Sequence, residues 1–180
     1  MSAVGQRIVV VGSSGSGKTT LARRLAQQRG IPHVELDALH WEPNWTEAPV
    51  EVFRDRVTVA LAGPTWVMDG NYSRVRDISW GRADTVIWLD YSLPRILWQL
   101  IRRTLHRAVT REELWSGNRE SLRRSLISRD SILFWMLTHY GTIRRRYRQA
   151  LTDPQYAHIH IIRLRSPRAT ERWIARTFGQ

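Results

Sequence analysis

The chain contains 180 residues, a length that suits one domain with a substantial hydrophobic core. Its composition, 42% hydrophobic and 24% charged, is typical of a soluble globular protein, and the lack of cysteine excludes a disulfide framework and a thiolate metal site. No signal-peptide pattern opens the sequence and no apolar run approaches the length of a membrane span, so we expect a cytoplasmic protein with no membrane partner.

The net charge of +12 indicates that the protein binds anionic ligands. The phosphates of nucleic acid are one such ligand. An enzyme that holds polyphosphate ligands in a cleft also needs many arginines around that cleft. The sequence carries no zinc-ligand spacing and no recognised DNA- or RNA-binding signature. Nucleic acid therefore stays open as a partner but is not favoured.

The first predicted strand, at residues 7–11, leads into Gly12-Ser13-Ser14-Gly15-Ser16-Gly17-Lys18-Thr19, and a helix follows up to Gly30. This is the G-x-x-x-x-G-K-[ST] spacing of a Walker A motif, in which glycines let backbone amides surround a phosphate at a helix N-terminus. We expect Lys18 to contact the β- and γ-phosphates of ATP and the Thr19 hydroxyl to bind Mg²⁺. The predicted ATP-binding residues are Gly12, Ser13, Gly15, Ser16, Gly17, Lys18, Thr19 and Thr20. The alternative is a glycine-rich turn without a ligand.

Lys18 is the only lysine in the chain, and every other basic residue except histidine is arginine. A coding bias towards arginine would be tolerated on a solvated surface. Inside a phosphate-binding loop a compact ammonium and a wide planar guanidinium are not equivalent. The one lysine therefore lies where replacement by arginine should be least tolerated.

Strands and helices alternate along the rest of the sequence. The predicted elements are a strand at 32–37, an aromatic, turn-rich stretch at 38–46, a helix at 47–62, a strand at 65–70, a loop at 71–76, a strand at 84–90 and a helix at 92–110. A polar interruption at 111–120 precedes helical patterns at 120–129 and 130–150, a strand at 156–164 and a closing helix from 166. This alternation predicts an α/β fold with a parallel sheet covered by helices on both faces.

Three acids follow predicted strands: Asp37, Asp69 and Asp90. Ligands of open parallel sheets bind at the carboxyl ends of the strands, so we expect these acids and the glycine loop to meet in one cleft.

The sequence resembles small bacterial proteins described as adenylate kinase-like or as DNA topology modulation proteins. The resemblance is carried by the glycine loop, 35–37 with Trp41 and Trp45, 69–72, 86–90 and 111–120. More broadly, it resembles the nucleoside-monophosphate-kinase branch of the phosphate-loop fold. That resemblance implies a three-layer P-loop NTPase fold with strand order 2-3-1-4-5, as a single domain over 1–180. It also implies an acceptor-binding region at about 37–63 and a short arginine-bearing helical lid at about 107–124.

The sequence departs from adenylate kinases after the third strand. There an aromatic residue, a proline and an arginine follow the acid and glycine, whereas this chain has Asn71-Tyr72-Ser73-Arg74. Arg74 falls near the expected arginine, but the acceptor pocket differs, and AMP as the acceptor is in doubt. The lid is short and lacks zinc ligands.

Each acid has a functional and a structural interpretation. Asp69, at the end of a buried strand beside the glycine loop, is the candidate Mg²⁺ ligand, with a turn or helix cap as the alternative. Asp37 is a candidate to orient an acceptor hydroxyl or take its proton, and an Asx turn is the alternative. For Asp90 a turn before Ser92 is favoured.

Arginines border the polar interruption on both sides. Arg103, Arg107 and Arg111 recur every four residues, and Arg119, Arg123 and Arg124 follow it. We expect arginines such as Arg107 and Arg119 to neutralise charge on the transferred phosphoryl group, as catalytic residues of the lid. The alternative is a solvated helical face paired with Glu112, Glu113 and Glu120. The run at 144–146 is expected to be an exposed helical face or an accessory anion patch.

The predicted acceptor-binding residues are Asp37, Trp41, Tyr72 and Arg74, where the aromatic rings can stack on a flat acceptor. Most of the nine tryptophans must nevertheless be core residues. The family resemblance also places 166–167 beside the adenine ring, through backbone contacts.

Together these features predict a kinase that uses ATP and Mg²⁺ and transfers the γ-phosphoryl group to a small acceptor. A nucleoside or nucleotide is the first candidate and another hydroxyl-bearing metabolite the second. The alternative is a nucleotide-dependent ATPase that binds nucleic acid.

Overall fold

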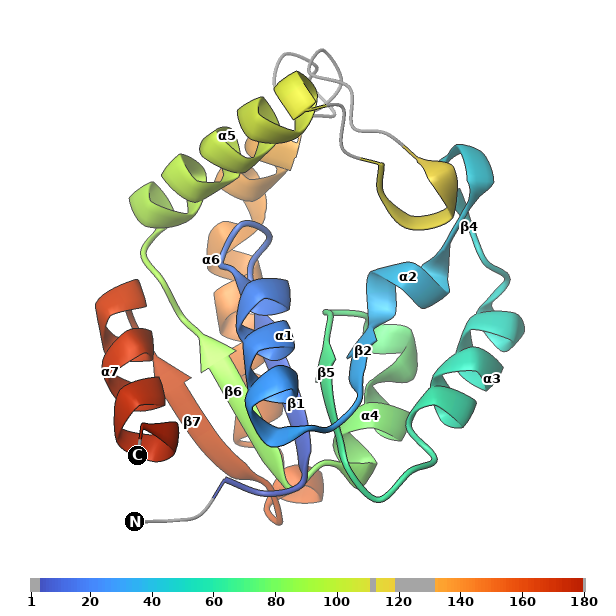
Figure 1. Ribbon diagram of the computed structural model, residues 1–180, viewed down its shortest axis with the longest axis vertical. Helices are drawn as coiled ribbons and strands as arrows, with labels where there is room; N and C mark the ends of the chain where they lie inside the picture. Colours follow the sequence, from blue (N-terminus) through green and yellow to red (C-terminus); the bar gives the residue numbers. More distant parts are fainter. Residues whose placement is uncertain (1–3, 111–112, 119–131, 180) are drawn as a thin grey trace.

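The computed structural model describes residues 4–110, 113–118 and 132–179. Its centre is a five-stranded parallel sheet in the order β2-β5-β1-β6-β7 (Figure 1). The strands are β1 (Arg7–Gly12), β2 (His33–Glu35), β5 (Trp66–Asp69), β6 (Thr85–Leu89) and β7 (His160–Leu164), and β3 (Trp41–Glu42) and β4 (Thr46–Glu47) form a separate antiparallel hairpin. Numbered along the chain, the five sheet strands have the order 2-3-1-4-5, so the predicted topology is confirmed.

The helices alternate with the sheet strands. They are α1 (Lys18–Arg29), α2 (Leu36–His40), α3 (Val50–Ala60), α4 (Arg76–Arg82), α5 (Leu93–Thr110), α6 (Ile132–Leu151) and α7 (Pro167–Phe178). Short 3₁₀ turns lie at η1 (Pro43–Trp45), η2 (Ser73–Val75), η3 (Trp115–Gly117) and η5 (Pro154–Tyr156). Among the described helices, none is both long enough and apolar enough to span a bilayer.

Successive residues of β1 pack on opposite faces of the sheet. Ile8 and Val10 belong to the core that includes residues of α1 and α7, whereas Val9 and Val11 belong to the core that includes residues of α3, α4 and α6. All four side chains are at most 2% exposed. A strand covered on both faces has no position for a polar residue, which explains the continuous apolar run. Figure 1 shows the resulting layers, with α1 and α7 in front of the sheet and α6 behind it.

The chain turns from strand to helix earlier than expected at the end of β2. β2 ends at Glu35, and Asp37 lies in the first turn of α2 instead of at the end of a strand. Gly70, at φ 142°, permits this turn, because a Cβ there would lie only 2.6 Å from the Cβ of Leu36. Asp37 is therefore presented by a short helix that packs directly on the end of β5.

Other boundaries differ for local reasons. α3 begins at Val50 rather than 47, because Thr46 and Glu47 pair with the preceding hairpin strand. α4 occupies residues predicted as loop and as the link to β6, since seven residues are too few to show an apolar repeat. β7 begins at His160 rather than 156, because η5 precedes it. The helical pattern predicted at 120–129 lies outside the described residues.

Candidate functional site

The glycine loop forms a concave surface at the N-terminus of α1. Gly15 and Gly17 have φ of 80° and 89°, the left-handed region that favours glycine. The first backbone hydrogen bond of α1 runs from the Leu21 amide to the Gly17 carbonyl at 3.0 Å. The three amides before it, at 18–20, therefore have no acceptor within the helix. Gly17 caps the helix without a side-chain bond. The loop therefore offers backbone donors and the positive end of the helix dipole to one ligand.

Lys18 lies where this loop meets Asp69 at the end of β5 and Asp37 on α2. Its Nζ donates a hydrogen bond to the Ser13 carbonyl at 3.3 Å. Burial lowers the pKa of the Lys18 ammonium, although Asp37 and Asp69 act to raise it. Two of the three predicted acids are thus close enough to Lys18 to influence its charge.

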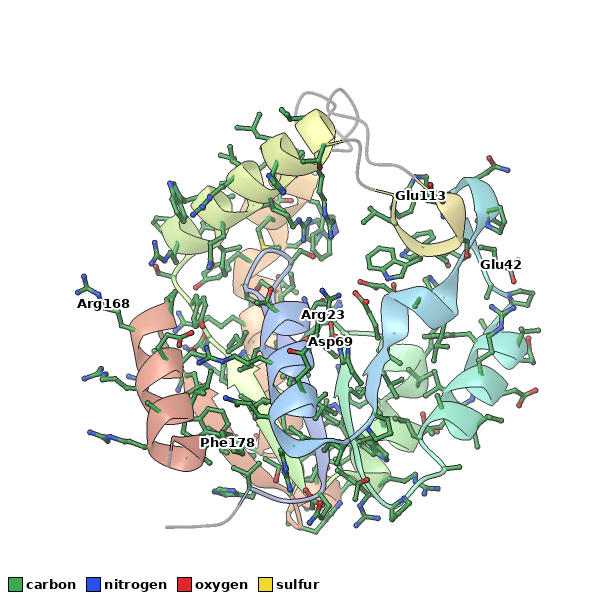
Figure 2. The ribbon with its side chains drawn as sticks, in the orientation of Figure 1. Arg23, Glu42, Asp69, Glu113, Arg168 and Phe178 are labelled. Atoms are coloured by element: carbon green, nitrogen blue, oxygen red, sulfur yellow. The ribbon has the colours of Figure 1, made fainter. Side chains whose placement is uncertain are left out.

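Asp69 is buried between two polar partners. Its Oδ1 accepts a hydrogen bond from the Thr19 hydroxyl at 2.8 Å, and its Oδ2 lies 2.7 Å from Nε2 of His33. The Asp69 side chain is 2% exposed and lies next to α1 (Figure 2). Thr19 and Asp69, the two predicted metal ligands, are therefore brought together. His33 was not predicted, because its contact depends on the register of β2 against β5, which local sequence does not reveal.

Two pockets open on either side of Lys18. The first, here called the P-loop pocket, has a volume of about 790 Å³ and lies between the glycine loop, α5 and the segment at 113–115. The second, here called the α6 pocket, has a volume of about 740 Å³ and lies between the glycine loop, the residues after β5, and α6. Each has a volume typical of small-molecule sites. Lys18 lines both pockets.

The P-loop pocket is strongly basic. Besides the loop residues Gly15, Gly17, Thr19 and Thr20, its lining includes Lys18, Arg23, Arg102, Arg103, His106 and Arg107. Arg107, a predicted catalytic residue, thus faces the glycine loop from α5, whereas Arg119 lies outside the described residues. Two acids, Glu35 and Glu113, also line the pocket. The excess of guanidinium groups suits a polyanionic ligand.

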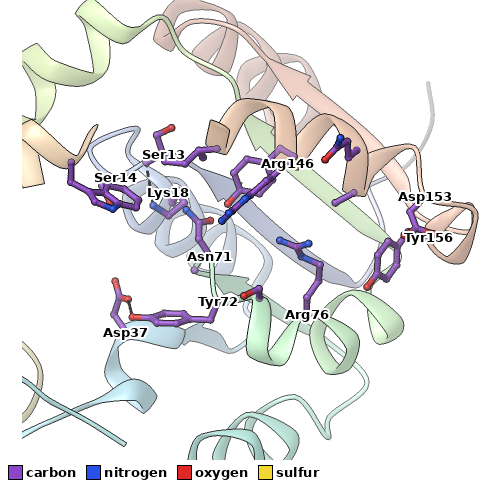
Figure 3. A pocket seen from close by; sticks show the side chains of 17 residues that line it. Ser13, Ser14, Lys18, Asp37, Asn71, Tyr72, Arg76, Arg146, Asp153 and Tyr156 are labelled. Atoms are coloured by element: carbon purple, nitrogen blue, oxygen red, sulfur yellow. Dashed lines mark hydrogen bonds between the residues drawn. The ribbon is translucent and has the colours of Figure 1, made fainter. Parts of the chain in front are cut away.

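Asp37 and Tyr72, two of the predicted acceptor-binding residues, lie together in the α6 pocket (Figure 3). The Tyr72 hydroxyl donates a hydrogen bond to Asp37 Oδ1 at 2.6 Å, which leaves Oδ2 for another partner. Burial, together with the Asp37 charge, raises the pKa of Tyr72 above its ordinary value. Tyr72 therefore stays a hydrogen-bond donor and fixes the orientation of the Asp37 carboxylate.

Glu35 adds a third carboxylate near Lys18, which sequence reasoning did not single out. Burial, and then the Asp69 charge, raises the pKa of Glu35, against a hydrogen bond from the Trp115 side chain that lowers it. Glu35 and Trp115 both line the P-loop pocket. The end of β2 is thus linked to the segment that follows α5.

The other predicted acceptor residues lie outside both pockets. Trp41 packs edge-on against Trp45, which packs on Trp115 in the same way. Their backbones hold the segment at 115–118, since the Ser116 hydroxyl donates to the Trp41 carbonyl at 2.7 Å and the Trp45 amide donates to Asn118 at 2.8 Å. Arg74 is exposed and forms an ion pair with Glu47 at 3.2 Å.

Asp90 does not join the cleft, contrary to the expected convergence of three strand-end acids. Its side chain, 2% exposed, is held by two arginines, with Arg144 Nε 2.6 Å from Oδ1 and with Arg163 bonded to Oδ2. Although burial favours the neutral acid, these hydrogen bonds hold the pKa of Asp90 below its ordinary value. Asp90 does lie in the link between β6 and α5, where a turn residue was expected, but its role is to bind these arginines. In the run at 144–146, Arg145 and Arg146 are exposed as expected, whereas Arg144 is half-buried. Arg144 ties α6 to the end of β6 instead.

The residues present fit ATP and Mg²⁺. Besides the loop amides, the buried Ser16 hydroxyl has no hydrogen-bond partner among the described residues, so it is available to a phosphate. The Thr19 and Asp69 oxygens are the hard ligands that Mg²⁺ prefers, and Mg²⁺ usually takes few protein ligands and completes its shell with water and phosphate. Accordingly, the described part of the chain contains no cluster of three or more His, Cys, Asp or Glu residues that could hold a metal.

Comparisons with known proteins agree with this geometry. Residues 8–114, which include the glycine loop, Asp37 and Asp69, match a family model described as an AAA domain. Shikimate kinases from Synechococcus elongatus and from a Synechococcus species are each 26% identical to this chain over 143 residues, covering 64% of this chain and 72% of the relative.

Solved kinase structures share the fold. A shikimate kinase from Bacteroides thetaiotaomicron superimposes with a TM-score of 0.52 at 13% identity, covering 95% of both chains. A gluconokinase from Sinorhizobium meliloti 1021 has a TM-score of 0.52 at 18% identity, covering 98% of this chain and 95% of its own. The five-stranded parallel sheet flanked by helices is thus that of P-loop kinases. These relatives do not support the narrower resemblance to adenylate kinase-like or DNA topology modulation proteins.

Proposed function

This chain belongs to the AAA domain family, and on that premise we propose that it is a kinase that transfers the γ-phosphoryl group of ATP to a hydroxyl group of a small acceptor. The observation that carries the proposal is the position of Lys18, which lines both the P-loop pocket and the α6 pocket. Phosphoryl transfer requires donor and acceptor on opposite sides of the transferred group, in line. The two pockets provide those two sides.

In this proposal the P-loop pocket binds ATP. The amides of the glycine loop and the ammonium of Lys18 bind the β- and γ-phosphates. Arg103 and Arg107, from α5, compensate the negative charge of the phosphates, and Arg119 is a further candidate outside the described residues. Thr19 and Asp69 hold Mg²⁺, which neutralises phosphate charge when bound. His33 fixes the Asp69 carboxylate so that Oδ1 stays beside Thr19.

The α6 pocket binds the acceptor. Tyr72 occupies one oxygen of Asp37, and the other oxygen orients the acceptor hydroxyl and takes its proton as the bond from that oxygen to the γ-phosphorus forms. The bond between the γ-phosphorus and the β–γ bridging oxygen breaks, and ADP leaves. Trp41, on the hairpin, and Arg74, on η2 and paired with Glu47 of the hairpin, support this region from outside the pocket. We retain nucleosides, nucleotides and other hydroxyl-bearing metabolites as acceptor candidates and add shikimate and gluconate, the acceptors in the names of the similar kinases.

The placement of the basic residues favours this proposal over a nucleotide-dependent ATPase that binds nucleic acid. Arginines from α1 and α5 line one pocket, and arginines from α4 and α6 line the other. Guanidinium groups that surround a concave site suit small anions, whereas a nucleic-acid duplex needs them along an extended surface.

A screen of candidate acceptors with ADP release as the readout tests the function. We expect ADP release that depends on one class of acceptor, on ATP and on Mg²⁺. The Lys18→Ala variant should keep its circular dichroism spectrum and lose turnover by about 10²–10³-fold, as when one transition-state donor is removed. Equal turnover by Lys18→Ala would contradict the mechanism. Duplex affinity that falls steeply with salt, with no acceptor-dependent ADP release, would favour the nucleic-acid alternative.

A further inference from the structure

Two arginines that sequence reasoning did not place at the site lie in the α6 pocket. Arg76 is the first residue of α4, and Arg146 lies in the middle of α6, so they come from opposite walls (Figure 3). Both guanidinium groups point into the pocket, and Arg146 lies on the Lys18 side (Figure 3). The pocket therefore contains a positive region next to the proposed position of phosphoryl transfer.

Neither of these arginines forms an ion pair within the described part of the chain, although their neighbours in sequence do. Asp77, the residue after Arg76, pairs with Arg54 at 2.7 Å instead. Arg144, two residues before Arg146, is taken by Asp90. The local acids are thus committed elsewhere. The Arg76 guanidinium also lies over the Trp80 ring, 5.3 Å from its centroid, and this contact through the face of the guanidinium leaves its N–H groups available to a ligand, as are those of Arg146.

The acids of the α6 pocket lie at its ends. Asp37 is bonded to Tyr72 at one end, and Asp153 lies beside Tyr156 at the other (Figure 3). Asp153 accepts a hydrogen bond from the Gln155 amide at 3.0 Å and so caps the 3₁₀ turn η5. Between these ends the lining combines the two guanidinium groups with Ile143, Tyr147 and Ala150. A ligand that fills the pocket from Asp37 outwards must pass these cations.

We propose that Arg76 and Arg146 bind an anionic group of the acceptor, either a carboxylate or a phosphate monoester. The acceptor is then an anionic hydroxy compound and not a neutral nucleoside or sugar, with its hydroxyl at Asp37 and its anion between α4 and α6. Guanidinium groups recognise both anions by paired hydrogen bonds, and a neutral acceptor would leave two like charges uncompensated beside Lys18. This inference rests on the proposed kinase function, and it assigns the specificity to Arg76 and Arg146 and not to Arg74.

Matched pairs of compounds test the inference. The pairs are a nucleoside 5′-monophosphate with its nucleoside, shikimate with its methyl ester, and gluconate with glucitol. ADP release measures transfer, and calorimetry measures binding with the P-loop pocket saturated by a non-hydrolysable ATP analogue and Mg²⁺. We expect one anionic compound to bind and its neutral partner to bind at least about tenfold more weakly, the loss expected for one charge-assisted hydrogen bond. Whether the phosphate or a carboxylate binds distinguishes the two kinds of anion.

Variants on α4 and α6 complete the test. Arg76→Gln and Arg146→Gln should each raise the Kd and KM of the anionic compound about tenfold or more, with the KM for ATP unchanged. Arg145→Gln is the matched control, because Arg145 is exposed on the same helix and lines neither pocket. A thermal melt checks that each variant folds. If Arg76→Gln does not fold, the Arg146→Gln variant alone decides the test, because Arg146 is exposed and its replacement should not affect folding.

Three results would overturn the inference: a neutral compound that binds as well as its anionic partner, no binding of any anionic compound, or unchanged anion affinity in Arg146→Gln. Transfer to a neutral acceptor would overturn it and leave the kinase proposal standing. If the wild-type protein binds an anion that Arg146→Gln does not bind, but transfers phosphate to no acceptor, the result would support the anion site and count against the kinase proposal.

Discussion

The contact between His33 and Asp69 predicts that a residue with no direct contact to phosphate controls the affinity for Mg²⁺. His33 Nε2 lies 2.7 Å from Asp69 Oδ2, on the side of the carboxylate opposite Thr19. His33→Leu removes this hydrogen bond and lets the carboxylate rotate away from Thr19. His33→Gln keeps a hydrogen-bond donor on a side chain of comparable reach.

The size of the effect follows from the kind of bond. A hydrogen bond to a charged group contributes about 1.5–3 kcal/mol, and about 1.4 kcal/mol corresponds to a tenfold change in affinity. His33→Leu should therefore lower the affinity for Mg²⁺ about 10- to 100-fold, the range found when residues that hydrogen-bond to metal ligands are removed. His33→Gln should recover part of that loss.

Two measurements check this prediction. The first is the Mg²⁺ concentration for half-maximal ADP release. The second is calorimetric binding of ATP with and without Mg²⁺, which does not depend on turnover. In His33→Leu only the binding with Mg²⁺ should weaken, because the glycine loop is unchanged. A variant that folds normally and keeps the wild-type Mg²⁺ dependence would refute the assignment of His33 and would weaken that of Asp69.

Two further predictions concern stability. Asp90→Asn should lower the free energy of unfolding by about 3 kcal/mol at pH 7, because it leaves Arg144 and Arg163 without their buried counter-charge. Since the pKa of Asp90 is lowered in the folded protein, the carboxylate stabilises the fold above its unfolded pKa of about 4, and this stabilisation is lost as the pH falls through the folded pKa. Urea unfolding of both proteins from pH 7 to pH 3 should show the gap closing, and a gap independent of pH would contradict the assignment. Gly70→Ala should reduce both the melting temperature and ADP release, since its Cβ would lie 2.6 Å from that of Leu36 and push α2, with Asp37, away from β5; an unchanged melting temperature would show that α2 adjusts freely.

The parts of the site that the sequence predicted are those fixed by local chain geometry. The glycine loop needs only its own residues, the strand before it and the helix after it. Asp69 ends a buried strand that lies next to β1, and the carboxyl end of that strand borders the loop. The α/β fold followed from the alternation of strands and helices, whereas the strand order followed from the family resemblance.

The parts that were missed depend on packing between distant elements. His33 reaches Asp69 only through the register of β2 on β5. Arg146 lines a pocket, whereas Arg144, two residues away, is bound to Asp90. All three positions at 144–146 carry the same side chain, so no pattern in the sequence separates their roles. Trp41 was expected to stack on the acceptor, but its ring packs on Trp45 and its backbone binds the segment at 115–118.

The position of the single lysine has a practical consequence. Lys18 carries the only side-chain amine of the chain, and it lies between the two pockets. An acylating reagent would find no second side-chain amine in the chain, and the lowered pKa of Lys18 leaves more of this amine in its nucleophilic form near neutral pH. The extent of lysine labelling therefore reports the fraction of molecules in which Lys18 is accessible. The decrease in labelling when a nucleotide is bound measures how fully that nucleotide covers Lys18.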